Sequence, residues 1–127
     1  MTDTSWALWV AVYDRLTADL SVPVYDSVPE GSTYPYVTMD SEDLQEMDAL
    51  SKTRDDRYLS LVVWSNFNGS SEVRKIIDSI QDALHRAPLT LASGRVIAAY
   101  VTRRRVAKDS DGKSFMGNVT VRVWTEN

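Results

Sequence analysis

The stretch VVWSNFNGSSEVRKIIDSIQDALH, from Val62 to His85, decides the fold, because a strand ends and a helix begins within it. Apolar residues run up to Trp64, and the polar residues and glycine at 66–69 end the strand. From Ser70 onward apolar residues return at steps of three and four, which is typical of an amphipathic helix. Pro88 cannot continue that helix, so we expect the helix to end just before it.

The strand before this helix and the hairpin after it supply the rest of a sheet. Residues 58–64 are apolar on both faces, as expected for a central strand. Alternating apolar residues at 96–101 and 115–123 predict two strands joined around Asp111-Gly112, which is a turn pair. The last third of the chain therefore reads as a β-hairpin.

The N-terminal region predicts a helix over residues 4–19, with an apolar stripe on one side. Aromatic residues at helical spacing usually belong to a core, so we expect this stripe to be buried. The alternative is that the stripe binds a partner. It consists of Trp6, Trp9, Val10, Tyr13, Leu16 and Leu20.

Prolines organise the segment that follows this helix. They bracket a short extended piece at Val24–Ser27, supply a tight turn at Pro29–Gly31, and precede a strand at Tyr36–Met39. Residues 40–57 carry many charges without a clear period, so we expect a surface loop that orders on meeting a partner.

These elements define an α+β fold, namely a mostly antiparallel sheet with two amphipathic helices packed on one face. The chain has 127 residues, of which 43% are apolar and 25% charged, the composition of one globular domain spanning residues 1–127. Asp14 and Arg15 interrupt the first apolar run well before it could span a membrane, so we expect no membrane partner.

Charge is divided unevenly along the chain. Residues 1–57 hold twelve acidic and four basic residues, a net charge of −8, whereas residues 58–127 carry a net charge of +4. If folding keeps these halves on different faces, neighbouring copies can meet head to tail, as in a ring. The alternative is that the excess acid lies in one solvated loop.

The sequence shows no catalytic machinery, so we expect neither an enzyme nor a cofactor. There is no cysteine, and His85 is the single histidine, which we assign to a structural role at the end of a helix. Asp109-Ser110-Asp111-Gly112 resembles part of a calcium loop, but the positions that should supply the other ligands hold Ala107 and Asn118. We therefore interpret this segment as a hairpin tip and predict no metal site.

The one basic cluster comprises Arg103, Arg104, Arg105 and Lys108. On a strand Arg104 would point away from its two neighbours. The sequence pI is near 4.9, so the whole protein would repel a DNA duplex at long range. A subunit contact with the acidic half, or a solvated strand end, is favoured over DNA binding.

Several of these phrases together resemble the tail-completion, or tail-terminator, family of long-tailed phages, prophages and gene-transfer agents. Residues 40–57 and 106–114 carry no resemblance, which suggests that they determine partner specificity. The phrases are VYDSVPEGSTYPYVTM at 24–39, VVWS at 62–65, GSSEVRKIIDSIQDALH at 69–85 and SGRVI at 93–97.

The resemblance implies a structural virion protein without turnover. Such a protein forms a hexameric ring at the neck end of the tail, caps the tail tube, ends its growth and offers the surface that the head joins. Its partners would be further copies of itself, the tail tube protein and the head-tail connector or stopper protein, with DNA passing through the ring without sequence-specific binding. Assembly would take place in the host cytoplasm.

We predict that the partner interfaces lie in the charged segments. Two other functions stay open: a connector or stopper on the head side, distinguished by which component it binds, and a small ligand-binding domain, detected by thermal stabilisation with ligand. The predicted interface residues are Glu42, Asp43, Glu46, Asp48, Arg103, Arg104, Arg105, Lys108, Asp109, Asp111 and Lys113.

Overall fold

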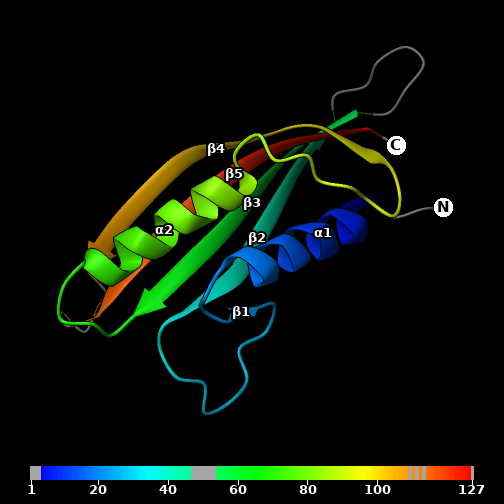
Figure 1. The fold of residues 1–127 in the computed structure, drawn as a ribbon. Coiled ribbons are helices and arrows are strands. Elements are labelled where there is room, and N and C mark those ends of the chain that lie inside the picture. The colour runs from blue at the N-terminus through cyan, green and yellow to red at the C-terminus, as the bar shows by residue number, and fades with distance from the viewer. Residues whose placement is uncertain (1–3, 47–53, 109, 111, 113, 127) are drawn as a thin grey trace.

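Five strands form one sheet in the order β1-β2-β3-β5-β4, and both helices cover the same face of it (Figure 1). The computed structural model describes every residue except 1–3, 47–53, 109, 111, 113 and 127. All neighbouring strands are antiparallel, apart from the short β1, which runs parallel to β2. The predicted α+β class and the two helices on one face are therefore confirmed. The elements are α1 (Thr4–Asp19), β1 (Val24–Tyr25), β2 (Tyr36–Glu46), β3 (Arg54–Ser65), α2 (Ser71–Leu84), β4 (Arg95–Lys108) and β5 (Phe115–Glu126).

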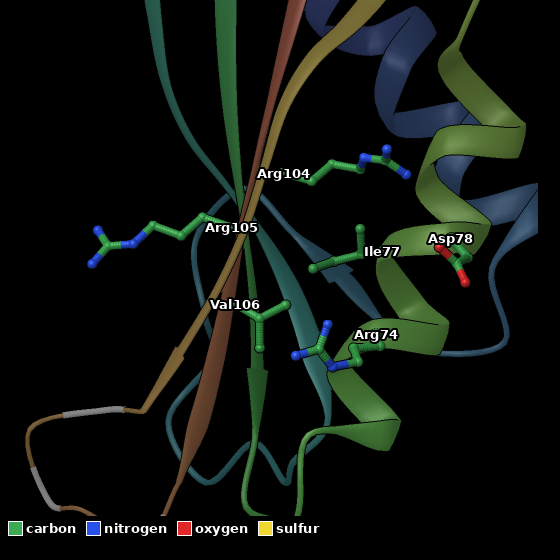
Figure 2. A pocket seen from close by; sticks show the side chains of 6 residues that line it. All are labelled: Arg74, Ile77, Asp78, Arg104, Arg105 and Val106. Atoms are coloured by element: carbon green, nitrogen blue, oxygen red, sulfur yellow. The ribbon is translucent and has the colours of Figure 1, made fainter.

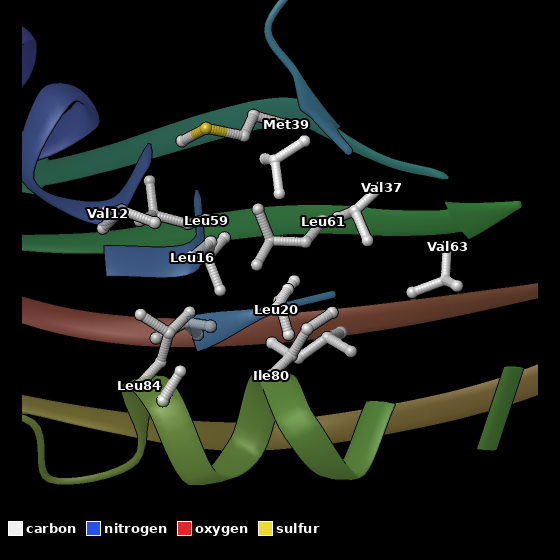
Figure 3. Packing of buried hydrophobic residues seen from close by; sticks show 14 of the residues in the cluster. Val12, Leu16, Leu20, Val37, Met39, Leu59, Leu61, Val63, Ile80 and Leu84 are labelled. Atoms are coloured by element: carbon white, nitrogen blue, oxygen red, sulfur yellow. The ribbon is translucent and has the colours of Figure 1, made fainter. Parts of the chain in front are cut away.

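The core lies between the helices and the centre of the sheet (Figure 3). Alternate residues of β3 point into it, and their partners in β5 do the same, as in the pairs Leu59 with Val121 and Leu61 with Val119. Helix α2 packs closely on β5, because a Cβ atom at Gly117 would lie 2.6 Å from Cδ1 of Ile77. We call this helix-bearing side the covered face, and the opposite side the open face.

Helix α1 forms where expected, but it turns a different side to the core. The exposed fraction is 62% for Trp6 and 37% for both Val10 and Tyr13. The prediction that this stripe is buried is therefore wrong for Trp6, Val10 and Tyr13, whereas Leu16 and Leu20 lie in the core and Trp9 packs against it. The helix is apolar on nearly all sides, and its smaller aliphatic residues fit the space above the sheet. The buried residues are Thr4, Ala7, Leu8, Val12 and Leu16.

The described parts of residues 40–57 are strand, so the prediction of a surface loop there is wrong. Strand β2 continues to Glu46 and β3 begins at Arg54, and the two pair in register from Ser41 with Ser60 to Glu46 with Asp55. Charged residues occupy both faces of these strand ends and hide the period of two. The covered face accepts them because Arg57 pairs with carboxylates there.

Candidate assembly interface

The outermost long strands of the sheet are β2 and β4, and part of each has no neighbouring strand along its outer edge. Strand β1 covers β2 only at Val37 and Thr38. At the other side of the sheet, the segment after α2 covers the middle of β4: the N–H of Arg86 donates to the carbonyl of Ala99 at 2.7 Å, and the N–H of Val101 donates to His85 Nδ1 at 3.0 Å. His85 thus has a structural role, as predicted, but it holds β4 rather than the end of its own helix.

The basic cluster occupies β4 beyond this covered part, and all of its residues are exposed. Arg103 and Arg105 pair with Thr120 and Asn118, which point to the open face, whereas Arg104 pairs with the core residue Val119. Figure 2 shows Arg104 pointing toward α2 and Arg105 pointing the opposite way. The predicted alternation of the three arginines is confirmed.

A groove of about 600 Å³ separates α2 from this part of β4. In Figure 2 the side chains of Arg104 and Arg74 reach toward it from the two sides, and Ile77 and Val106 form its apolar floor. Nε of Arg74 donates to Ser70 Oγ at 3.0 Å, which orients that guanidinium. Asp78 is the acidic residue among those that line the groove. The groove therefore has an apolar floor and a largely basic rim, suited to an apolar side chain flanked by acids.

The predicted acidic residues fall on β2, and they are not equivalent. Glu42 is bound within the molecule, because Oε1 accepts from Arg57 Nη1 at 3.1 Å and Oε2 accepts from Ser5 Oγ. Asp43 is exposed, and its partner in β3 is Tyr58, on the open face. Glu46 is the last residue of β2. The sheet thus carries acidic residues at its β2 edge and basic ones at its β4 edge.

Four residues of the predicted interface lie outside the described residues. Asp48 lies between β2 and β3 in the sequence, and the other three lie between β4 and β5. Lys108 is the last residue of β4 and pairs with Phe115, the first of β5. The three predicted residues between β4 and β5 are Asp109, Asp111 and Lys113.

A buried ion cluster around Arg57 joins three strands on the covered face. The side chain of Arg57 is 4% exposed. Besides Glu42, Nη2 donates to Asp55 Oδ2 at 3.1 Å and Nε donates to Thr125 Oγ1 at 3.0 Å. Because a buried charge is tolerated only when it is paired, this cluster fixes the ends of β2, β3 and β5 against one another. Sequence reasoning missed it by placing these residues in a loop.

The open face has an ion pair of its own, between Arg122 and Asp56. Nε and Nη2 of Arg122 donate to the two carboxylate oxygens at 2.9 and 2.7 Å, and the guanidinium lies over the rings of Tyr58 and Trp124. The hydrogen bonds from Arg122 hold the pKa of Asp56 below its ordinary value, although burial acts in the opposite direction. The alternation of β5 could have placed Arg122 on this face, but not its partner.

Helix α1 adds an exposed aromatic surface near the acidic edge. Trp6 and Trp9, with Ser5 and Glu42, line a notch of about 240 Å³. Nε1 of Trp9 donates to Asp26 Oδ1 at 2.8 Å, which holds that ring against the segment after β1. The alternative that the stripe contacts a partner thus gains a surface at its aromatic N-terminal part, whereas the core interpretation holds for Leu16 and Leu20.

Two further properties of the described residues concern metal binding and membrane spans. In the parts of the chain that the structure describes, no group of three or more histidine, aspartate or glutamate side chains is placed to hold a metal ion. Within the same residues, neither helix is both long and apolar enough to cross a membrane.

The exposed charges at the two edges of the sheet suit a protein that contacts other protein chains. Comparison with known proteins identifies the family. Residues 10–126 match the model of the family described as "Tail completion protein gp17", so the chain belongs to that family. No protein of curated function matches the chain.

A chain of a solved particle shares the fold over its whole length. It comes from a structure titled "Virion of native gene transfer agent (GTA) particle", with 23% identity, full coverage of both chains and a TM-score of 0.92. The predicted resemblance to tail-completion proteins is confirmed by the family match. As a member of the tail-completion family, the protein is a structural component of a virion tail.

Proposed function

We propose that the protein assembles as a hexameric ring that caps the tail tube, ends tube polymerisation and forms the surface to which the head joins. The observation that carries this proposal is the family match, which spans nearly the whole described fold. Completing a tail requires a contact with the end of the tube and a means of stopping further addition. A closed ring of small domains meets both requirements.

The distribution of charge supports self-association. Exposed acidic residues at one edge of the sheet and exposed arginines at the other cannot meet within one copy, but they can meet between copies. Contacts between two different surfaces close into a ring when the rotation between copies allows it. In this proposal, Asp43, Glu46 and the basic cluster of β4 belong to the contacts between copies.

The remaining partners follow from the position at the end of the tail. The ring would contact the tail tube protein on one side and the connector or stopper protein on the other, at the neck end of the virion. DNA would pass through it without sequence-specific binding, and the ring would form in the host cytoplasm before joining. It acts without catalysis and without a cofactor.

Particles that lack this protein provide the test, with tail length measured by electron microscopy. We expect tails of irregular or excessive length that are not joined to heads, and we expect the wild-type chain supplied in trans to restore uniform joined tails. Purified protein should bind one end of isolated tail tubes. Tails of normal length, combined with binding to isolated heads rather than to tubes, would contradict the proposal and indicate a connector or stopper on the head side.

A further inference from the structure

We propose that adjacent copies join edge to edge, with β2 of one copy pairing with β4 of the next, so that the sheet continues from copy to copy. This inference rests on the proposed ring. Beyond Thr38 on β2 and beyond Val101 on β4, no backbone hydrogen bond across the outer edge is found among the described residues. Both edges therefore offer free N–H and C=O groups, which can bind another strand.

The topology gives these two edges the right relative direction. Strands β2, β3, β5 and β4 alternate in direction across the sheet, so β2 and β4 are antiparallel to each other. The free parts of the two strands lie at opposite ends of the sheet, because Leu44 shares a row with Ala99 of β4 and Val106 shares a row with Val37 of β2. A neighbour that presents the free part of its β2 antiparallel to the free part of β4 is therefore displaced along the strands by roughly 20 Å. A closed ring accommodates this stagger when its strands are tilted to the ring axis, as in a β-barrel. The helices of both copies stay on the same side of the joined sheet.

The charges of the edges select this pairing over its alternatives. The free part of β4 carries Arg103, Arg104 and Arg105, and the free part of β2 carries the exposed residues Asp40 and Asp43. Two β4 edges would repel each other, as would two β2 edges, because like charges on paired strands are destabilising. Charged edges often serve only to prevent aggregation. Edges of opposite sign, however, leave the pairing of β2 with β4 attractive.

The side chains on the covered face also fit. Leu44 pairs with Arg57 within the sheet and therefore points to the covered face, where it is 50% exposed. If Leu44 lies opposite Val106 of the next copy, it covers the apolar floor of the groove next to Ile77. On the open face, the same register places Asp43 diagonally across from Arg105, within reach of a long side chain.

Charge reversal at one edge at a time tests the pairing. R104E/R105E turns two of the cations of the β4 edge into acids, and D40K/D43K turns two of the acids of the β2 edge into cations; these four side chains are exposed and form no hydrogen bond or ion pair within the described residues. Light scattering at low salt should give the wild type about six times the 14.3 kDa monomer mass. Each variant alone should lose this assembly, and an equal mixture of the two should regain it.

Two controls make the result specific. D14K/D82K changes the net charge as much as D40K/D43K does, but on exposed positions of the two helices and not on the edge strands, so it should keep the wild-type mass. Circular dichroism should show all variants folded. Edge pairing is overturned if either edge variant assembles as the wild type does, or if the mixture of folded variants stays monomeric while the wild type assembles.

Cross-linking within the virion covers the case in which the ring closes only on the tube. The chain has no cysteine, so a short bis-maleimide reacts only with the thiols introduced by L44C and V106C. We expect the double variant on tails to form a ladder of covalent oligomers, and each single variant to stay monomeric. If tails are capped and joined but the double variant gives no ladder, the edge pairing is wrong and the proposed function stands. If wild-type protein is absent from tail ends, the proposed function itself fails.

Discussion

The two faces of the sheet treat an arginine in opposite ways. On the covered face, Arg57 is 4% exposed and three side chains accept its hydrogen bonds. On the open face, the side chain of Arg122 is 35% exposed, binds one carboxylate and lies over two aromatic rings. The first arginine holds strands together under a helix, whereas the second can exchange its partners for water. Burial, and not residue type, therefore decides which charges maintain the fold.

The largest expected effect of a substitution is that of Arg57→Ala. Removing the guanidinium leaves Glu42 and Asp55 without their buried cation, and breaking a buried pair in this way costs about 3–5 kcal/mol. The free energy of unfolding, from urea denaturation, measures the loss. We expect the variant to be folded at most marginally at 37 °C.

The open face provides the matched comparison. Arg122→Ala should cost about 1–3 kcal/mol, since Asp56 loses its partner but removal of the 35% exposed arginine side chain admits water to the carboxylate. Arg103→Ala, at the exposed edge, should stay within about 0.5 kcal/mol of the wild type. If Arg122→Ala proved as damaging as Arg57→Ala, the proposed difference between the faces would not hold.

Gly117→Ala tests the packing of the covered face. The new methyl group would lie 2.6 Å from Cδ1 of Ile77 and 2.8 Å from Cγ1 of Val73, so these two side chains, or the helix that carries them, must shift. Overpacking of this kind costs about 1–3 kcal/mol, measured as a change in the free energy of unfolding. Gly69→Ala is the control, because a Cβ atom there meets nothing within 4 Å.

A second substitution checks the cause of that loss. Ile77→Val removes the Cδ1 atom, so the double variant with Gly117→Ala should lose less stability than the two single effects added together. Additive effects would mean that the strain arises elsewhere.

The two helices show what the sequence could and could not decide. Helix α2 has polar residues opposite its apolar stripe, so its buried residues, such as Ile76 and Ile80, follow directly from the period. Helix α1 is apolar on almost every side, and the period alone could not tell whether Trp6 or Leu8 faces the core. The available space above the sheet decides it, and that depends on residues far away in the chain.

The charged ends of β2 and β3 show, in the sheet, the same limit of prediction from local sequence. Asp55, Asp56 and Arg57 have the composition of a loop, yet all three are buried in β3. Besides Glu42, their partners include Thr125 and Arg122, which are more than sixty residues away. Local composition therefore favoured a loop, and only the tertiary pairing makes a strand possible. The alternation of Arg103–Arg105 was predictable, because it depends only on the period of a strand.

A smaller effect is expected from a neutral hydrogen bond on the open face. Nδ2 of Asn118 donates to Ser60 Oγ at 2.9 Å across β3 and β5. Asn118→Ala should cost about 0.5–1.5 kcal/mol in the free energy of unfolding. Ser60→Ala should cost a similar amount, and the double variant should not lose the sum, because both changes remove the same bond. Full additivity would show that this bond contributes nothing to the open face.

The smallest expected effect is a pH dependence that belongs to the open face. Because the hydrogen bonds from Arg122 lower the pKa of Asp56 in the folded state, the stability that this carboxylate contributes is complete above its unfolded pKa, about 3.9. That contribution is lost as the pH falls through the lower, folded pKa. The melting temperature followed from pH 6 to pH 2 should therefore fall below about pH 4.

Asp56→Asn separates this contribution from those of other carboxylates. The variant should start from a lower melting temperature and change less below about pH 4, since an amide has no proton to gain. Added salt should reduce the difference only in part, because Asp56 is 3% exposed whereas the side chain of Arg122 is 35% exposed. If the melting temperatures of the wild type and of Asp56→Asn fell equally below about pH 4, water would already screen the pair of Asp56 and Arg122. The open face would then resemble the sheet edges, where arginines are available to other chains, more than it resembles the covered face.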